Sequence, residues 1–269
     1  MSHKNNNLLY KFTGFNKNHL QLMSLLINQE LTLRYKRSII GVGWTLLNPM
    51  LTSLILWLVF SFLFGGKLES GQQFAPYLMA GVLLNTYFNQ GLIQCANSIS
   101  INGSILTKVS VPPKIFAFAA ALSGMINFVI GLIPLAIVVY LSGQKVAITF
   151  PFVIILGLLL AMFITGIGLV LSIIFIRFED SKNIVNVLLM ILVYLTPIFY
   201  PISILSDKMQ MIVNLNPLTS FLDIFRWSFS NNAQATYFDF LYLFVVSVLF
   251  FVIGNLLFKK YWNRIVVML

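Results

Sequence analysis

The sequence predicts an all-α integral membrane protein with six transmembrane helices. Of its 269 residues, 59% are hydrophobic and only 9% are charged, whereas a soluble domain has roughly 25% charged residues. The apolar residues also form long runs along the whole chain, and about 20 such residues are needed to cross the roughly 30 Å hydrocarbon core of a bilayer. No stretch is left for a separate soluble catalytic domain.

Residues 1–45 are expected to be a cytoplasmic N-terminal region, and residues 46–269 a single transmembrane domain. The polar, asparagine-rich start lacks the basic end, apolar centre and cleavage site of a signal peptide. Between about 18 and 37 the pattern predicts an amphipathic helix, which lies on the membrane surface, packs against the bundle, or does both. Its apolar residues at helical spacing are Leu20, Met23, Ile27 and Leu31.

Six apolar stretches are long enough to be transmembrane helices. They lie at about 46–64, 76–100, 115–141, 146–176, 184–200 and 238–258. Between the last two lies a shorter apolar piece, 218–229, which is expected to form a re-entrant or interfacial helix.

Both termini are expected in the cytoplasm, because lysine and arginine concentrate on that side of membrane proteins. With six spans, the cytoplasmic side holds 13 basic and three acidic residues, and the outer side holds four of each. The net charge of +10 therefore faces anionic membrane lipid. Nucleic acid is not an expected partner, since no basic patch interleaved with exposed aromatic residues accompanies this charge.

Neither a cofactor nor a metal ion is expected in this chain. It has no GxxxxGK[ST] motif, so ATP and its magnesium ion would have to bind elsewhere. The two histidines, His3 and His19, and the single Cys95 form no zinc-binding pattern. Apart from Asp239 at the start of the last one, the predicted spans also lack the charges that ion-coupled carriers use. Energy for uphill transport would therefore come from another polypeptide.

Uncharged polar residues share one half of the second predicted span when it is drawn at about 100° per residue. The members of this amide stripe are Asn85, Thr86, Asn89, Gln90, Gln94 and Asn97. The stripe forms either interhelical hydrogen bonds or the wall of an aqueous pore. Because amides beside aromatic rings suit a polyhydroxylated ligand, the same lining is expected to include aromatic side chains. These are Tyr87, Tyr194, Phe199 and Tyr200.

The fifth predicted span ends in two prolines, Pro197 and Pro201, which either shape an exit gate or mark a simple helix end. Further on, Asp223 and Arg226 are three residues apart, so they can pair on one helix face. Such a pair is either structural or part of a ligand site.

Two short loops on the predicted cytoplasmic side, 102–114 and 177–183, are candidates for contact with a soluble subunit. Compact solvated turns explain their composition equally well. The candidate contact residues are Asn102, Lys108 and Pro112 in the first loop, and Arg177, Glu179 and Asp180 in the second.

Several motifs occur in a specific order along the chain. The strongest is RYKRSIIGVGW at 34–44, followed by Asn48-Pro49. Smaller ones are Lys108-Val109 with Pro112, Thr196-Pro197-Ile198 with Tyr200, and Asn216-Pro217. In this order and spacing, over nearly the whole chain, they resemble the membrane-spanning subunits of type-2 ABC exporters for cell-surface polysaccharides, such as O-antigen, capsule and teichoic acid exporters.

The resemblance implies two copies of this chain, two copies of a separate ABC ATP-binding subunit, and a pore between the two membrane chains. It also implies that the first cytoplasmic loop is a coupling helix and that the substrate is a glycan on a polyprenyl or similar lipid. One departure is visible. Where the family often has Arg-Asp, this chain has Phe178-Glu179-Asp180 after Arg177. Asp180 therefore matches the family motif better than Glu179 does.

The resulting hypothesis is the permease subunit of an ATP-driven exporter of lipid-linked polysaccharide in a bacterial cytoplasmic membrane. Arg34, Lys36 and Arg37 either guide a lipid pyrophosphate to the entrance or anchor the chain by the positive-inside rule. The alternatives are an exporter of teichoic acid, a drug or a small lipid, an integral membrane transferase acting on lipid-linked sugars, and a passive channel. A transferase needs acidic metal ligands or a general base, and the predicted cytoplasmic face has only three acids.

Overall fold

The computed structural model of the chain describes residues 17–36, 38–41, 43–64, 73–106, 108, 111–143, 149–229 and 237–266. The predicted all-α class is confirmed for these residues. The helices are α2 (Lys17–Tyr35), α3 (Gly43–Phe64), α4 (Phe74–Ile101), α5 (Gly103–Leu106), α6 (Lys114–Leu141), α7 (Phe152–Arg177), α8 (Ser181–Tyr194), α9 (Asp207–Asn214), α10 (Pro217–Phe229) and α11 (Tyr237–Ile265), with a 3-10 turn at Ile202–Ile204.

Four helices of the described residues, α3, α6, α7 and α11, are long and apolar enough to cross a membrane. The chain is therefore a multi-pass membrane protein. Helix α4 has 28 residues, and at 1.5 Å per residue its length of about 42 Å is also sufficient. Helix α8 has only 14 residues and covers about 21 Å, which is less than the hydrocarbon core. Six crossings therefore stay a prediction.

The predicted bounds differ most from the observed helices at the fourth, fifth and sixth spans. Helix α8 ends at Tyr194, and residues 195–200 form turns instead of the last part of a helix. Pro197 and Pro201 explain this end, because a proline has no backbone N–H to donate. The fourth predicted span, 146–176, begins too early, since α7 starts at Phe152 directly after Pro151. The sixth, 238–258, ends too early, since α11 continues to Ile265.

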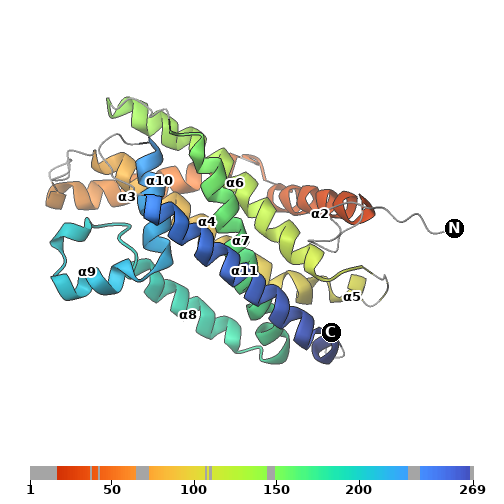
Figure 1. Ribbon diagram of the computed structural model, residues 1–269. Helices are drawn as coiled ribbons and strands as arrows, with labels where there is room; N and C mark the ends of the chain where they lie inside the picture. The colour runs from red at the N-terminus through yellow and green to blue at the C-terminus, as the bar shows by residue number, and fades with distance from the viewer. Residues whose placement is uncertain are drawn as a thin grey trace.

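Helix α4 lies at the centre of the bundle and packs against α3, α6, α7 and α10. Its buried face joins a large apolar core, in which Phe88 stacks on Phe163 and Phe163 contacts Phe221 of α10. Figure 1 shows α5, the α7–α8 turn and the end of α11 at one end of this bundle. The polar helix is thus surrounded by apolar ones, which keep most of its surface away from lipid.

Helix α2 packs along α6, where Leu26 is buried against Ile115, Phe116 and Ala119. Contact with the bundle, one of the two arrangements predicted for the amphipathic helix, is therefore confirmed. Its contact with the membrane surface stays a prediction.

Helices α7 and α11 approach each other very closely at two glycines. A Cβ atom at Gly166 would meet the backbone carbonyl of Phe250, and a Cβ atom at Gly254 would meet the backbone of Gly166. Small residues at a helix crossing allow such close backbone packing, which is a main source of helix association in membranes.

Candidate functional site

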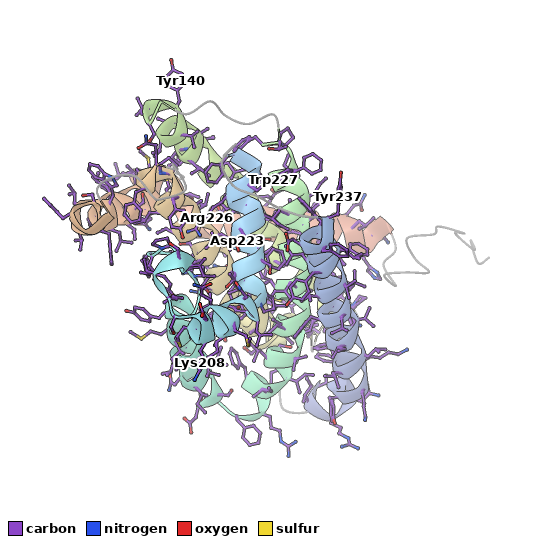
Figure 2. All side chains as sticks on the ribbon, turned by 60° about the vertical axis from the view of Figure 1, so that its left-hand side comes forward. Tyr140, Lys208, Asp223, Arg226, Trp227 and Tyr237 are labelled. Atoms are coloured by element: carbon purple, nitrogen blue, oxygen red, sulfur yellow. The ribbon has the colours of Figure 1, made fainter. Side chains whose placement is uncertain are left out.

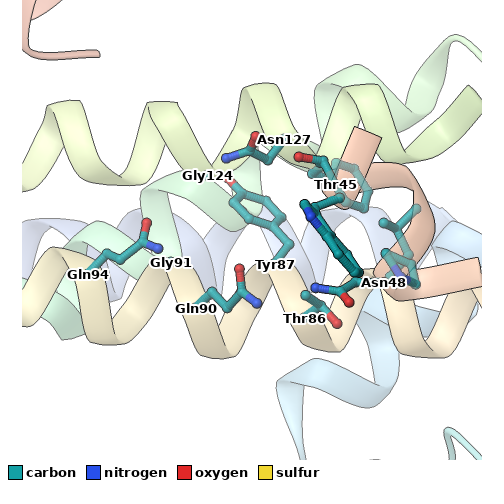
Figure 3. Close-up of a pocket in the computed structure, with 13 residues that line it drawn as sticks. Thr45, Asn48, Thr86, Tyr87, Gln90, Gly91, Gln94, Gly124 and Asn127 are labelled. Atoms are coloured by element: carbon teal, nitrogen blue, oxygen red, sulfur yellow. The ribbon is translucent and has the colours of Figure 1, made fainter. Parts of the chain in front are cut away.

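The amide stripe of α4 borders a pocket of about 370 Å³ between α3, α4 and α6, here named the central pocket (Figure 3). Its polar lining residues are Thr45, Asn48, Thr86, Gln90, Gln94 and Asn127, and its aromatic ones are Trp44, Tyr87 and Phe128. None of the described residues that line it is charged. Amides and hydroxyls both donate and accept hydrogen bonds, and the Trp44 side chain is 43% exposed. The pocket therefore suits an uncharged ligand with many hydroxyl groups.

Tyr87 forms the wall of the central pocket. Its hydroxyl donates to the Gly157 carbonyl of α7 over 3.3 Å, and its ring stacks on Phe128 at 5.1 Å between centroids. Gly124 leaves room for this ring, because a Cβ atom there would lie 3.1 Å from it. The tyrosine is thus held by three helices, which gives the pocket a rigid side.

A second pocket of about 400 Å³, here named the α8 pocket, lies between α4 and α8. It is lined by Asn89, Gln90, Ile93, Gln94, Asn186, Leu189, Met190 and Val193. Gln90 and Gln94 line both pockets. Residues of the amide stripe therefore line both the central pocket and the α8 pocket.

Among the described residues, the side-chain hydrogen bonds of the stripe stay within α4. Asn89 donates its amide to the Asn85 side-chain oxygen over 3.3 Å, and Asn97 donates to the Ile93 carbonyl over 3.0 Å. Asn85 and Asn97 line neither the central nor the α8 pocket. These bonds do not join helices, so they give no support to the interhelical interpretation of the stripe, and the pore interpretation stays a prediction.

The three aromatic residues predicted near the end of the fifth span lie outside both pockets. Tyr194 is 62% exposed, and its carbonyl accepts a hydrogen bond of 2.7 Å from the Tyr200 hydroxyl. Phe199 stacks on Phe60 of α3 at 6.2 Å. Their contribution to a glycan path stays a prediction.

The segment after α8 is held by Arg226 of α10, whose side chain is only 4% exposed. Its guanidinium donates to the carbonyls of Pro197 at 2.9 Å, Tyr77 at 3.3 Å and Ile198 at 3.4 Å, and it lies 3.3 Å from the centre of the Tyr77 ring. The Tyr77 hydroxyl in turn donates to the Tyr200 carbonyl over 2.8 Å. We name this group the arginine clamp.

Asp223 lies three residues before Arg226 on α10 (Figure 2), and its side chain is exposed. The clamp engages backbone carbonyls, so its geometry favours the structural interpretation of Arg226. Tyr77, the partner that the sequence reasoning missed, lies near the start of α4, 149 residues away in the chain. No local pattern indicates such a long-range contact.

The two candidate contact loops lie at the same end of the bundle (Figure 1). The first contains the short helix α5 and begins with Asn102, which donates to the Ser98 carbonyl over 2.8 Å. Lys108 is exposed and Pro112 is half-buried. In the second loop, Arg177 lies over the Phe178 ring at 5.3 Å, while Glu179 and Asp180 are exposed. Both loops present side chains that a partner can reach.

The predicted phosphate-guiding residues are described only in part. Lys36 is exposed directly after α2. The Arg34 side chain and the whole of Arg37 lie outside the described residues, and the role of the three stays a prediction.

The first loop is tied to α11 where α6 begins. The Lys114 ammonium donates to the side-chain oxygen of Asn255 at 2.8 Å. We expect Asn255→Leu to lower the free energy of unfolding by about 1–3 kcal/mol, because a half-buried ammonium loses its side-chain acceptor and keeps the more distant Asn255 backbone carbonyl at 3.4 Å. Asn255→Asp keeps an acceptor and should be tolerated. Thermal unfolding of the two purified variants checks this, and equal stability of both would contradict it.

Fold and pockets together define a class: a multi-pass helical membrane protein whose central cavity is lined by neutral amides. Residues 21–230 match the ABC-2 type transporter family, so the chain belongs to this family. It is similar to the O-antigen export system permease protein of Myxococcus xanthus, with 29% identity over 224 residues and 81% of each chain covered.

Two further relatives are similar over most of their length. The O-antigen export system permease protein of Klebsiella pneumoniae is 22% identical over 241 residues, which cover 89% of this chain and 91% of the relative. The capsule polysaccharide export inner-membrane protein of Neisseria meningitidis is 22% identical over 235 residues, which cover 87% and 88%.

Proposed function

We propose that this chain is the permease subunit of an ATP-driven exporter that moves a lipid-linked polysaccharide out of the bacterial cytoplasm. Family membership and the polysaccharide exporters among its relatives support this function. The central pocket supports a polysaccharide as the substrate, because neutral amides and the partly exposed indole ring of Trp44 line it together. Sugar hydroxyls need donors and acceptors together, and the C–H faces of sugars pack on flat aromatic rings.

In this proposal, two copies of the chain assemble with two copies of an ABC ATP-binding subunit, which binds ATP and magnesium. The absence of a phosphate-binding motif from the sequence supports the need for that partner. Six helices cross the inner membrane, namely α3, α4, α6, α7, α8 and α11, and both termini are cytoplasmic. Helix α10 is re-entrant, and α2 lies at the cytoplasmic interface.

ATP binding would close the partner's dimer and move the loops at 102–114 and 177–183. The exposed side chains of Lys108, Glu179 and Asp180 support contact at this end. A permease with two helix arrangements then shifts toward the one in which its pore is open. Arg34, Lys36 and Arg37 would guide the lipid pyrophosphate toward the entrance.

Reconstitution tests the proposal. Proteoliposomes with the chain and its ATP-binding subunit should move a fluorescent lipid-linked glycan across the bilayer when ATP is supplied, and vesicles with the chain alone should not. Equal translocation in the two preparations would show that the ATPase does not drive it and would overturn the proposal.

A variant of the central pocket addresses the substrate path. Gln90→Leu removes an amide shared by the central and α8 pockets, and we expect glycan translocation to fall about tenfold, as expected for a lost interaction of about 1.4 kcal/mol. Thr52→Val changes an exposed position of α3 and serves as the control. Unchanged translocation by Gln90→Leu would place the glycan path elsewhere.

A further inference from the structure

A third pocket of about 370 Å³, here named the α2 pocket, lies between α2, α4 and α6. Its polar lining comprises Gln29, Glu30, Gln94 and Asn102, and its apolar lining includes Leu26 and Phe116. Gln94 also lines the central and α8 pockets. Unlike those two pockets, the α2 pocket contains a carboxylate.

Several polar groups of this pocket offer hydrogen-bond acceptors to a ligand. The Gln94 side-chain oxygen is buried and has no hydrogen-bond partner within the described part of the chain. Asn102 directs its amide nitrogen to the Ser98 carbonyl over 2.8 Å, which leaves its side-chain oxygen as an acceptor. An ionised Glu30 only accepts, and its roughly four lone-pair positions can serve a ligand in addition to a neighbour in the chain.

A ligand that satisfies these acceptors must bring donors. Sugar hydroxyls are donors, and the apolar wall of Leu26 and Phe116 can cover the C–H face of a sugar ring. A phosphate has the opposite character, because it is negatively charged and rich in acceptors. The Glu30 carboxylate would repel it.

We propose that the α2 pocket binds one neutral sugar unit of the lipid-linked glycan, with Glu30 and Gln94 accepting hydrogen bonds from its hydroxyls. This inference rests on the proposed function and names the group that the subunit takes up first. The phosphates of the lipid carrier lie outside this pocket.

The spacing of polar residues on α4 connects this pocket to the central one. Thr86 and Gln90 line the central pocket, and Gln94 lines both pockets. Successive members are four residues apart, which is about 6 Å along a helix. A glycan leaving the α2 pocket thus meets a new hydrogen-bonding side chain at each helical turn.

Binding of two matched probes tests the inference. Octyl β-glucoside carries a neutral sugar on an alkyl chain, and octyl phosphate carries an anion on the same chain. Both are titrated into the purified full-length chain in lipid nanodiscs. We expect the glucoside to bind, the phosphate to bind at least tenfold more weakly, and Glu30→Gln to weaken glucoside binding about tenfold, since hydrogen bonds to an ionised acceptor are roughly twice as strong.

A second variant separates ligand binding from a structural role. Gln94→Leu should weaken glucoside binding without lowering the unfolding temperature, because the replaced oxygen has no partner to lose in the described chain. Asp207→Asn, an acid-to-amide change at the exposed start of α9, should bind the glucoside like the unaltered chain.

Two results would overturn the inference: tighter binding of octyl phosphate than of octyl glucoside, or unchanged glucoside binding by Glu30→Gln. Its failure is distinguishable from failure of the proposed function. If glycan translocation depends on ATP but glucoside binding does not depend on Glu30, only the inference about the α2 pocket is contradicted. If glucoside binding depends on Glu30 but translocation does not depend on ATP, only the proposed exporter function is contradicted.

Discussion

Replacing Gly254 with leucine is expected to abolish the accumulation of folded protein. Any side chain at this position enters the space of the Gly166 backbone on α7. A flexible side chain can move away, but a helix backbone cannot move without separating α7 from α11. Overpacking ordinarily costs about 1–3 kcal/mol, and we expect at least the upper part of this range here. The measurement is the yield of monodisperse protein after extraction, together with its unfolding temperature.

The matched control is Gly157→Ala on α7. A Cβ atom at this glycine would lie 3.6 Å from side-chain atoms of Met125 and Phe128, which is ordinary van der Waals contact. This variant should accumulate and unfold like the unaltered protein. Normal yield and stability of Gly254→Leu would mean that the close approach of α7 and α11 is not required.

Arg226→Met is expected to lower the free energy of unfolding by about 3 kcal/mol or more. Methionine preserves much of the buried volume but donates no hydrogen bond, so the carbonyls of Tyr77, Pro197 and Ile198 lose their donor. The contact between the guanidinium and the Tyr77 ring is lost as well. The segment that follows α8 would then come away from α4 and α10.

A double-mutant cycle measures the coupling inside the arginine clamp. Tyr77→Leu removes both the ring beneath the guanidinium and the hydroxyl that reaches Tyr200. We expect the double variant with Arg226→Met to differ from the sum of the single effects by about 1 kcal/mol or more. Asp223→Asn should cost much less than Arg226→Met, because the Asp223 side chain is exposed and acts on Arg226 only through its charge. Additive effects, or equal loss from Asp223→Asn, would contradict the clamp.

Much of the helical architecture could be predicted, because apolar runs and their lengths depend only on neighbouring residues. The second and third predicted spans, 76–100 and 115–141, differ from α4 and α6 by at most two residues at each end. The fifth could not be placed as well. Its apolar residues continue to Tyr200, but the helix stops at Tyr194 and the following turns are held by Arg226 from α10. The hydropathy of the fifth span gives no information about this contact with Arg226.

The candidate site was predictable only as a helix face. Periodicity placed Gln90 and Gln94 on the same half of α4 as Asn85 and Asn97, but only the first two line the central pocket. Trp44 of α3 and Asn127 of α6, which complete that pocket, were not predicted to line it. A single amide within an apolar span carries no local signal that distinguishes a pocket wall from a helix interface.

Composition and helical periodicity were sufficient for the membrane class, most helix positions and the polar face of α4, because these follow from local chemistry and the spacing of residues along one helix. Which neighbours meet that face depended on packing. The apolar face of α4 packs on α7 and α10, whereas its polar face borders pockets, two of which arise where side chains from three helices leave space. Such contacts join segments that are far apart in the chain, so no short window of sequence contains both partners.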